Sequence, residues 1–244
     1  MSKKSAIKSK SSSTSLIIGF GEIGQSLYEV LKNHYFLEVS DITIKSEPLS
    51  RDVDVMHICF PFSEDPKKFI GWVKQYQKKY NPKYTVIHST VPLGITRKCN
   101  AFFSPCRGIH PFLEKSLTTF VKYLAPKNNY LKKYFEKAGI KIELVAKPKT
   151  LEAMKLYCTT IYGLNIIAEK EIYNFCKKHG LDYKIVYEDC NRTYNDGYEK
   201  LGFPQFKKYL LKHYTGKIGG HCIVPNCKLL NTPVANFILK NDKW

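Results

Sequence analysis

Short apolar runs and longer amphipathic stretches alternate over the first 150 residues. Between the apolar runs, apolar side chains recur at helical spacing over residues 23–31, 66–80 and 129–138, which predicts three helices. Strands that alternate with helices are typical of a parallel sheet covered on both faces. We therefore predict an α/β fold with a doubly wound parallel sheet. Its strands are expected at residues 16–18, 36–41, 53–60, 84–90, 101–104 and 140–145.

The pattern changes at residue 148. Apolar residues at helical spacing run from Thr150 to His179, and Gly180 ends this long helix. We expect a disordered tail at 1–14, where Lys and Ser dominate, and a smaller, mainly helical domain at 148–244 that holds the substrate and the dimer contact. The long helix is apolar over much of its circumference, which favours a homodimer built on it. Packing within one chain is the alternative.

The junction between the first strand and the first helix carries a glycine motif. Residues 19–24 read G-F-G-E-I-G. The first glycine permits a tight turn, the second lets a pyrophosphate approach the backbone, and the third lets helix and strand pack closely. Unpaired N–H groups at the start of the helix then bind phosphate. The motif indicates a Rossmann-type dinucleotide-binding domain at 15–147.

A carboxylate at the end of the second strand indicates which dinucleotide binds. Asp41 lies 17 residues after Gly24, where an acidic side chain accepts a hydrogen bond from the ribose 2′-hydroxyl and repels a 2′-phosphate. We therefore predict NAD as the cofactor, in preference to NADP. The predicted cofactor-binding residues of this region are Gly19, Phe20, Gly21, Glu22, Ile23, Gly24, Asp41 and, at the end of the third strand, Phe60.

The composition narrows the choice of partners. The chain has 244 residues and a net charge of +18, and 35 of its 39 basic residues are Lys. Proteins that read nucleic acid usually use Arg for bidentate contacts, so we do not expect nucleic acid as a partner. A positive field instead favours anionic cofactors and small anionic substrates.

The number and spacing of the cysteines indicate the cellular compartment of the protein and whether it binds a metal ion. The eight cysteines include no C-x-x-C pair. We expect reduced thiols in a cytoplasmic protein, with Cys59 and Cys158 buried in apolar segments. We expect no metal site, because neither Cys nor His shows ligand spacing. No apolar run reaches the length of a membrane span, so no membrane association is expected.

Three further segments complete a resemblance to a known family. Residues 89–96 read S-T-V-P-L-G-I-T after a strand, residues 152–155 read E-A-M-K in the long helix, and residues 219–223 read G-G-H-C-I. Together with the glycine motif, and in this order, they resemble the nucleotide-sugar 6-dehydrogenases, which oxidise UDP- or GDP-sugars to uronic acids with NAD. The resemblance implies that Ser89 and Thr90 lie near the nicotinamide ribose.

The same resemblance implies three candidate catalytic residues. Cys222 would be the nucleophile, whose thiol traps the intermediate aldehyde as a thiohemiacetal before a second hydride transfer gives a thioester. Lys155 would stabilise the oxyanion as a cation, and Asn165 follows it by ten residues in the same helix. The alternatives are a structural cysteine and one more surface lysine. His221, beside Cys222, would tune the thiol or cap a turn.

The sequence departs from the family pattern at several positions. Cys106 stands where the family has the Glu that helps hydrolyse the thioester, Thr159 replaces an Asn, and Asn226 replaces an Asp. The family also continues into a second Rossmann-like domain beyond the position of Trp244. Two other functions therefore stay open. One is a prephenate-type dehydrogenase that transfers a single hydride, with His110 polarising the substrate hydroxyl, and the other is a dinucleotide-binding module without catalysis.

Overall fold

The computed structural model describes residues 13–43, 52–109, 111–220 and 222–243. The chain forms two units, Met1–Lys155 and Leu156–Trp244. The boundary between them falls inside the long helix α6 (Pro148–His179). Most of the expected tail at 1–14 lies outside the described residues, but Thr14 already belongs to the first strand and is buried there.

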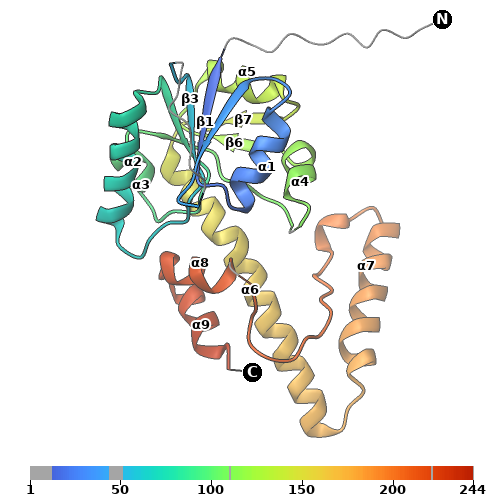
Figure 1. Ribbon diagram of the computed structural model, residues 1–244. Coiled ribbons are helices and arrows are strands. Elements are labelled where there is room, and N and C mark those ends of the chain that lie inside the picture. Colours follow the sequence, from blue (N-terminus) through green and yellow to red (C-terminus); the bar gives the residue numbers. More distant parts are fainter. Residues whose placement is uncertain (1–12, 44–51, 110, 221, 244) are drawn as a thin grey trace, which may run out of the picture. The chain divides into compact units, whose positions relative to one another are not determined.

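The first unit is built on a five-stranded parallel sheet (Figure 1). Its strands are β1 (Thr14–Ile18), β2 (Phe36–Ser40), β3 (Val55–Ile58), β4 (Tyr84–Ile87) and β5 (Phe102–Phe103), in the order β2-β1-β3-β4-β5. Strand β1 pairs with β2 on one side and with β3 on the other, so the direction of winding reverses at β1. The doubly wound sheet predicted from the apolar pattern is confirmed.

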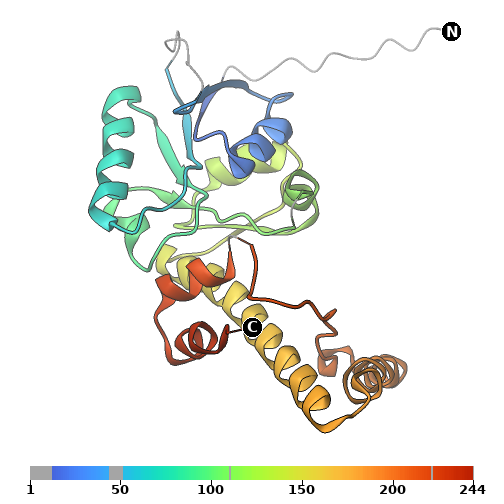
Figure 2. The ribbon, with the colours of Figure 1, turned by 60° about the horizontal axis from the view of Figure 1, so that its bottom comes forward.

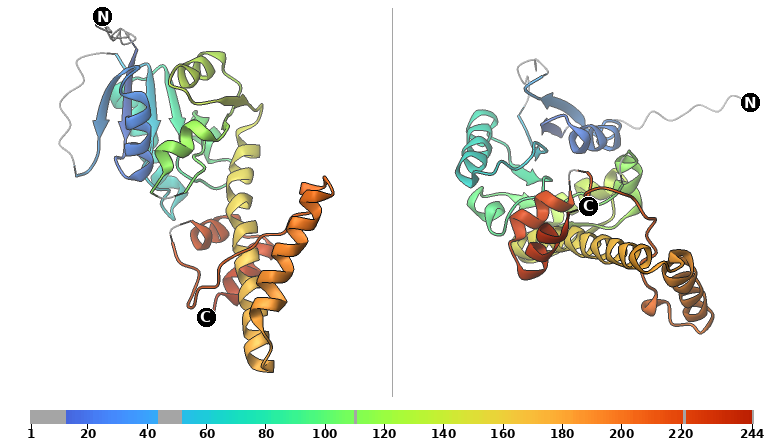
Figure 3. Two further views of the ribbon diagram at one scale, coloured as in Figure 1. Left: turned by 90° about the vertical axis from the view of Figure 1, so that its right-hand side faces the viewer. Right: turned by 90° about the horizontal axis from the view of Figure 1, so that it is seen from below.

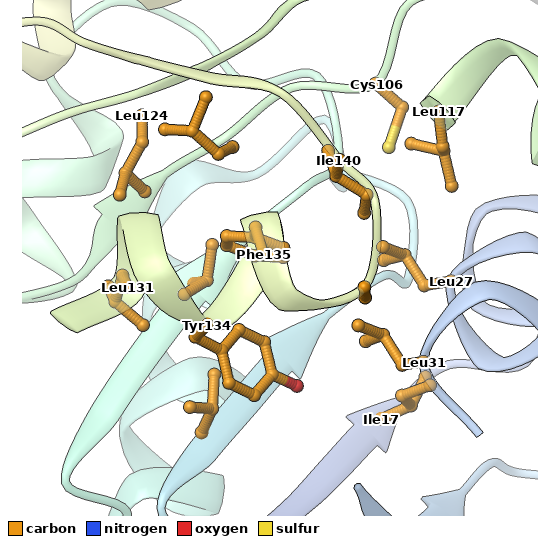
Figure 4. Packing of buried hydrophobic residues seen from close by; sticks show 14 of the residues in the cluster. Ile17, Leu27, Leu31, Cys106, Leu117, Leu124, Leu131, Tyr134, Phe135 and Ile140 are labelled. Atoms are coloured by element: carbon orange, nitrogen blue, oxygen red, sulfur yellow. The ribbon is translucent and has the colours of Figure 1, made fainter. Parts of the chain in front are cut away.

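Helices cover both faces of this sheet. One face is covered by α1 (Glu22–Leu31), α4 (Leu113–Thr119) and α5 (Asn129–Lys137), and the other by α2 (Pro66–Tyr80), α3 (Ile95–Lys98) and the first turn of α6. Successive residues of a strand point to opposite faces. Ile17 therefore packs with Leu27 and Leu31 of α1 in one core (Figure 4). Its neighbour Ile18 belongs to the second core, together with Phe69 of α2.

Three short elements of the first unit were not predicted from the sequence. They are α3, α4 and β6 (Lys122–Leu124). The predicted last strand is present as β7 (Ile142–Leu144), but it pairs with β6 in a separate two-stranded parallel sheet and does not extend the main sheet. An antiparallel bridge between Phe103 and Ala125 joins the chain after β6 to strand β5. This bridge holds β6 close to the carboxyl end of the main sheet.

The second unit is mainly helical, as predicted. The remainder of α6 packs with α8 (Ile223–Leu230) and α9 (Pro233–Asn241), which lie beside it in Figure 2. Gly163 of α6 permits this close approach, because a Cβ there would lie 2.6 Å from Ile223 Cγ2. After α6 come the π-helix η1 (Lys184–Asp189), α7 (Cys190–Lys200) and the short helix η2 (Pro204–Phe206) (Figure 3). None of the described helices has both the length and the apolar character needed to span a membrane.

Candidate functional site

The glycine loop connects β1 to α1, and each of its three glycines meets a different requirement. Gly19 has a φ of +92°, and a Cβ there would lie 2.6 Å from the backbone nitrogen of Phe60. A Cβ at Gly24 would lie 2.1 Å from the carbonyl oxygen of Gly19. Gly21 has a φ of −69°, and a Cβ there would meet no described atom within 4 Å. Packing therefore requires the first and third glycines, whereas a ligand close to the backbone would account for the second.

The start of α1 presents backbone N–H groups beside this loop. Gly21 is the N-cap residue, and no side chain of the described residues caps the helix. The first turn of a helix carries its positive dipole end and is a common site for phosphate. The predicted residues Glu22 and Ile23 begin this turn, and the ring of Phe20 packs edge-on against Tyr28, with centroids 5.6 Å apart. The segment is thus suited to hold a phosphate through its backbone.

A pocket of about 730 Å³ lies at the carboxyl ends of β1, β2 and β3. Ligands of open α/β sheets bind at this edge, where the winding reverses. The glycine loop lines the pocket together with Asp41 and Phe60, both predicted. Trp72 and Tyr76 of α2 also line it, and the ring centroids of Phe60 and Trp72 are 6.2 Å apart. These aromatic rings form an apolar wall of the kind that a purine ring packs against.

Asp41 ties the end of β2 to the glycine loop. Its Oδ2 accepts a hydrogen bond from the Phe20 N–H at 2.6 Å, and its Oδ1 accepts from the Thr43 N–H and hydroxyl at 2.9 and 2.7 Å. These bonds, with that from Phe20 the largest cause, hold the pKa of Asp41 below its usual value. A carboxylate has about four lone-pair sites, so three donors leave it able to accept from a ribose hydroxyl.

The predicted residues after β4 are tied to their neighbours by side-chain hydrogen bonds. Ser89 is buried, and its Oγ donates to the Phe60 carbonyl oxygen at 2.5 Å, which joins the ends of β3 and β4. Glu152 of α6 is also buried. Its two carboxylate oxygens accept from the N–H groups of Gly94 at 2.5 Å and Thr96 at 2.9 Å. Glu152 therefore fixes the loop that contains Ser89 and Thr90 to the start of α6.

Two lysines bind the loop after β5. The Lys155 amine donates to the carbonyl oxygen of Cys106 at 2.8 Å. The Lys122 amine donates to the carbonyl oxygens of Ser104 at 2.6 Å and Pro105 at 3.0 Å, and it lies 3.4 Å from the Cys106 sulfur. Lys122 is buried, and burial lowers its pKa. The sequence did not identify Lys122, although a lysine within the apolar run of residues 120–125 was an available signal.

A row of buried hydrogen bonds ends at the Ser104 carbonyl. Ser15 Oγ lies 2.7 Å from Tyr134 Oη, which lies 3.0 Å from His57 Nε2. His57 Nδ1 lies 3.0 Å from His88 Nε2, and His88 Nδ1 lies 2.7 Å from the Ser104 oxygen. Burial lowers the pKa of His57 to about 3 and that of His88 well below its usual value, so both rings are neutral at pH 7. Because a carbonyl only accepts, each Nδ1 carries the hydrogen and each Nε2 accepts.

The remaining predicted residues belong to the second unit. Cys222 precedes α8 as its N-cap residue and is exposed. Asn165 is donor to the carbonyl oxygen of Ile161 at 2.8 Å, one turn earlier in α6. The two family departures in this unit contact each other, because the Asn226 amide donates to the Thr159 hydroxyl at 2.9 Å. This contact between the two positions was not predicted from the sequence.

Two further expectations concern the candidate histidines and the absence of a metal site. His110 and His221 lie outside the described residues. Within the described ranges, no group of three His, Cys, Asp or Glu side chains is arranged to hold a metal ion. The groups suited to a dinucleotide are those of the glycine loop and the pocket beside it.

Several dehydrogenases of known structure are similar to this chain in fold. No protein-family model and no curated protein sequence matches the chain. Two nucleotide-sugar enzymes of known structure are similar: a UDP-N-acetyl-mannosamine dehydrogenase from Staphylococcus aureus (15% identity, TM-score 0.68, 94% of this chain and 67% of that one) and a UDP-glucose dehydrogenase from Pyrobaculum islandicum (14% identity, TM-score 0.68, 96% and 68%). The chain thus spans about two thirds of the length of each.

A shorter enzyme has a similar fold and a length closer to that of this chain. It is a 3-hydroxyisobutyrate dehydrogenase from Mycobacterium tuberculosis, with 11% identity and a TM-score of 0.64. The alignment covers 94% of this chain and 92% of that one. Identities this low show a shared fold, with a Rossmann-like sheet followed by helices.

Proposed function

We propose that this protein is an NAD-dependent oxidoreductase that oxidises a CH–OH group of an anionic substrate. The observation that carries the proposal is the pocket of about 730 Å³ where the winding of the sheet reverses, with Gly21 and Asp41 on its wall. The named activities of the proteins with similar folds support an oxidoreductase. The net charge of +18 supports an anionic substrate. A bound nicotinamide would supply the hydride acceptor at this edge of the sheet.

The choice of NAD over NADP rests on Asp41. Its lowered pKa keeps the carboxylate charged at neutral pH, and a charged carboxylate disfavours a 2′-phosphate nearby. Calorimetric titration with both dinucleotides tests this part of the proposal. We expect NAD to bind more tightly, and the variant Asp41→Asn to lose the preference. Tighter binding of NADP to the unaltered protein would remove Asp41 from this role.

We assign catalysis to Lys155 and Cys222, with a nucleotide-linked sugar as the substrate. The Lys155 amine donates one hydrogen bond to the Cys106 carbonyl, and its other two N–H bonds are suited to a substrate oxygen that becomes negatively charged. The exposed Cys222 thiol would add to the aldehyde that the first oxidation produces. Asn165 would be a further polar group of the site. The proposal requires the Lys155 amine and the Cys222 sulfur to converge on one substrate.

A second candidate is a dehydrogenase that removes one hydride from a hydroxyacid and stops at the carbonyl product. One observation favours it, because Cys106, a buried thiol, stands where the nucleotide-sugar family has the Glu that helps hydrolyse the thioester. A 3-hydroxyisobutyrate dehydrogenase also has a similar fold. In this candidate Lys155 keeps its role, whereas Cys222 has none in the chemistry.

One experiment separates these functions and the module without catalysis. The protein with NAD is screened by thermal shift against UDP-sugars, GDP-sugars and 3-hydroxyacids, and each stabilising compound is then followed by NADH absorbance. A ligand present at 100 times its Kd raises the stability by about 2.7 kcal/mol, which a thermal shift detects. Two NADH per substrate and sensitivity to Cys222→Ser support the nucleotide-sugar function. One NADH without that sensitivity supports the hydroxyacid function, and stabilisation without NADH supports the module.

A further inference from the structure

A second pocket lies within the second unit and belongs to none of the functions proposed above. It has a volume of about 230 Å³, and it is bordered by the C-terminal half of α6 and by the segment 213–216. The dinucleotide pocket of the first unit is about 730 Å³. The smaller pocket therefore has room for a small ion or one to two phosphate groups but not for a dinucleotide. The side chains that border it are rich in hydrogen-bond donors.

Lys170 lines this pocket and is almost fully buried. Only 4% of it is exposed, and its amine donates to the carbonyl oxygens of Tyr214 and Gly216, each at 2.6 Å. Among the described residues these two neutral carbonyls are its only acceptors. An ammonium has three N–H bonds, so one is left for a ligand. A buried cation without an anionic partner favours the binding of an anion beside it.

His213 also lines the pocket, and two contacts hold its ring in a fixed orientation. Its ring stacks on Tyr173 with centroids 3.5 Å apart, and its Nδ1 lies 2.8 Å from Glu169 Oε1. The same oxygen accepts from the Tyr183 hydroxyl at 2.6 Å, and Glu169 is buried. Because a carboxylate oxygen only accepts, His213 Nδ1 is the donor, and Nε2 is the ring nitrogen left for a ligand. Oε1 of Glu169 thus accepts from both His213 and Tyr183.

The other side chains that line the pocket add a second lysine and two neutral polar groups. Lys177 lines it, and no described residue accepts a hydrogen bond from the Lys177 amine. Asn174 and Thr215 add an amide and a hydroxyl. Two lysines, an amide and a hydroxyl thus line a pocket to which no described Asp or Glu side chain contributes. We infer that this pocket binds a phosphoryl group, either of inorganic phosphate or of a phosphate ester.

The test uses a neighbouring pair of lysines on the full-length protein. Lys177 lines the pocket, whereas the adjacent Lys178 is exposed and does not line it. Lys177→Met and Lys178→Met remove the same charge, and both positions are exposed, so both variants should fold as judged by circular dichroism. Inorganic phosphate is titrated by calorimetry at constant ionic strength, and Thr215→Val serves as a second variant of the pocket.

The expected result is phosphate binding that is equal in the unaltered protein and in Lys178→Met, and about tenfold weaker in Lys177→Met, because one charge-assisted hydrogen bond is lost. Parallel titrations with glucose 1-phosphate distinguish free phosphate from an ester as the tighter ligand. Equal affinity in Lys177→Met and the unaltered protein would place phosphate elsewhere, at the glycine loop for example, and would overturn the inference. Equal loss in both lysine variants would indicate only the general positive field and would also overturn it. NAD titrations of the same variants are expected to be unchanged, so a failure here is separate from a failure of the proposed oxidoreductase.

Discussion

At the scale of single residues, two donors meet at one buried acceptor, because His88 Nδ1 and the Lys122 amine both donate to the carbonyl oxygen of Ser104. The sequence predicted neither contact, whereas it did identify residues of the dinucleotide pocket. Gly21 and Asp41 were predicted because their roles follow from local order: a strand, a turn, a helix and the end of the next strand. Lys122 was not predicted, because it lies in β6, a strand too short to recognise from the sequence. Its hydrogen bond to the Ser104 carbonyl also joins residues 18 positions apart. His57 and His88 meet because β3 and β4 are neighbours, and the sequence alone did not order the strands.

The buried histidines predict that the protein loses stability in mild acid. The folded-state pKa of His57 is about 3, and that of His88 is also lowered, whereas an unfolded chain binds a proton at each histidine near pH 6.5. The unfolded state therefore binds more protons, and the free energy of unfolding falls as the pH drops from about 6.5 towards 3. The slope is roughly 1.4 kcal/mol per pH unit for each histidine. Urea unfolding at pH 7, 6 and 5 measures this pH dependence, and we expect a smaller slope for His88→Asn. A free energy of unfolding that is equal at pH 7 and pH 5 would contradict a pair of neutral buried histidines.

The cysteines yield a second prediction at this scale. Cys59 is buried as expected, but the expectation that Cys158 is buried is wrong, because this residue of α6 is exposed. Cys190 and Cys222 are exposed as well. If Cys222 is the nucleophile, we expect alkylation at neutral pH to label it before the other two. Mass mapping checks the order of labelling, and a rate at Cys222 no faster than at Cys158 and Cys190 would leave the thiol-assisted reaction without support.

At the scale of elements, length decided what the apolar pattern could predict. The long helices α2 and α6 and the β1–α1–β2 segment were predicted because each has several periods of apolar spacing. Helix α4 has seven residues and β6 has three, which is too few for a period to be recognised. Strand β7 was predicted, but its pairing with β6 was not, because that pairing depends on a partner that the sequence did not indicate.

The space around each glycine predicts opposite effects for Gly→Ala substitutions at Gly24 of α1 and at Gly71 of α2. A Cβ at Gly24 would lie 2.1 Å from the Gly19 carbonyl oxygen, so Gly24→Ala forces α1 away from β1 and costs about 1–3 kcal/mol or more. Gly71 lies inside α2, and a Cβ there would meet no described atom within 4 Å. Gly71→Ala should therefore stabilise the protein by about 0.5–1 kcal/mol. Urea unfolding of both variants tests this; a neutral Gly24→Ala would show that α1 does not pack as described.

At the scale of the whole molecule, the exposed apolar side chains of α6 predict self-association. Tyr157, Ile161 and Tyr162 are 41%, 44% and 43% exposed in a single chain. Burying such side chains between two copies removes apolar surface from water, which favours a homodimer. Light scattering should report a dimer at tens of micromolar and a monomer for Ile161→Glu. A control substitution at the exposed Lys200 of α7, Lys200→Glu, should leave the dimer intact. A monomeric unaltered protein would contradict a dimer built on α6.

The central claim is that the glycine loop and its pocket hold NAD, and Gly21→Ala tests it most directly. A Cβ at Gly21 meets no described atom, so this variant should lose no more than about 1 kcal/mol of stability, mainly through the N-cap preference for glycine over alanine. The same Cβ would occupy the space that the pyrophosphate needs. Calorimetric titration should therefore give NAD binding to the unaltered protein and binding at least about tenfold weaker, or 1.4 kcal/mol, to Gly21→Ala. Absence of NAD binding to the unaltered protein, or equal affinity in a folded Gly21→Ala, would contradict the account.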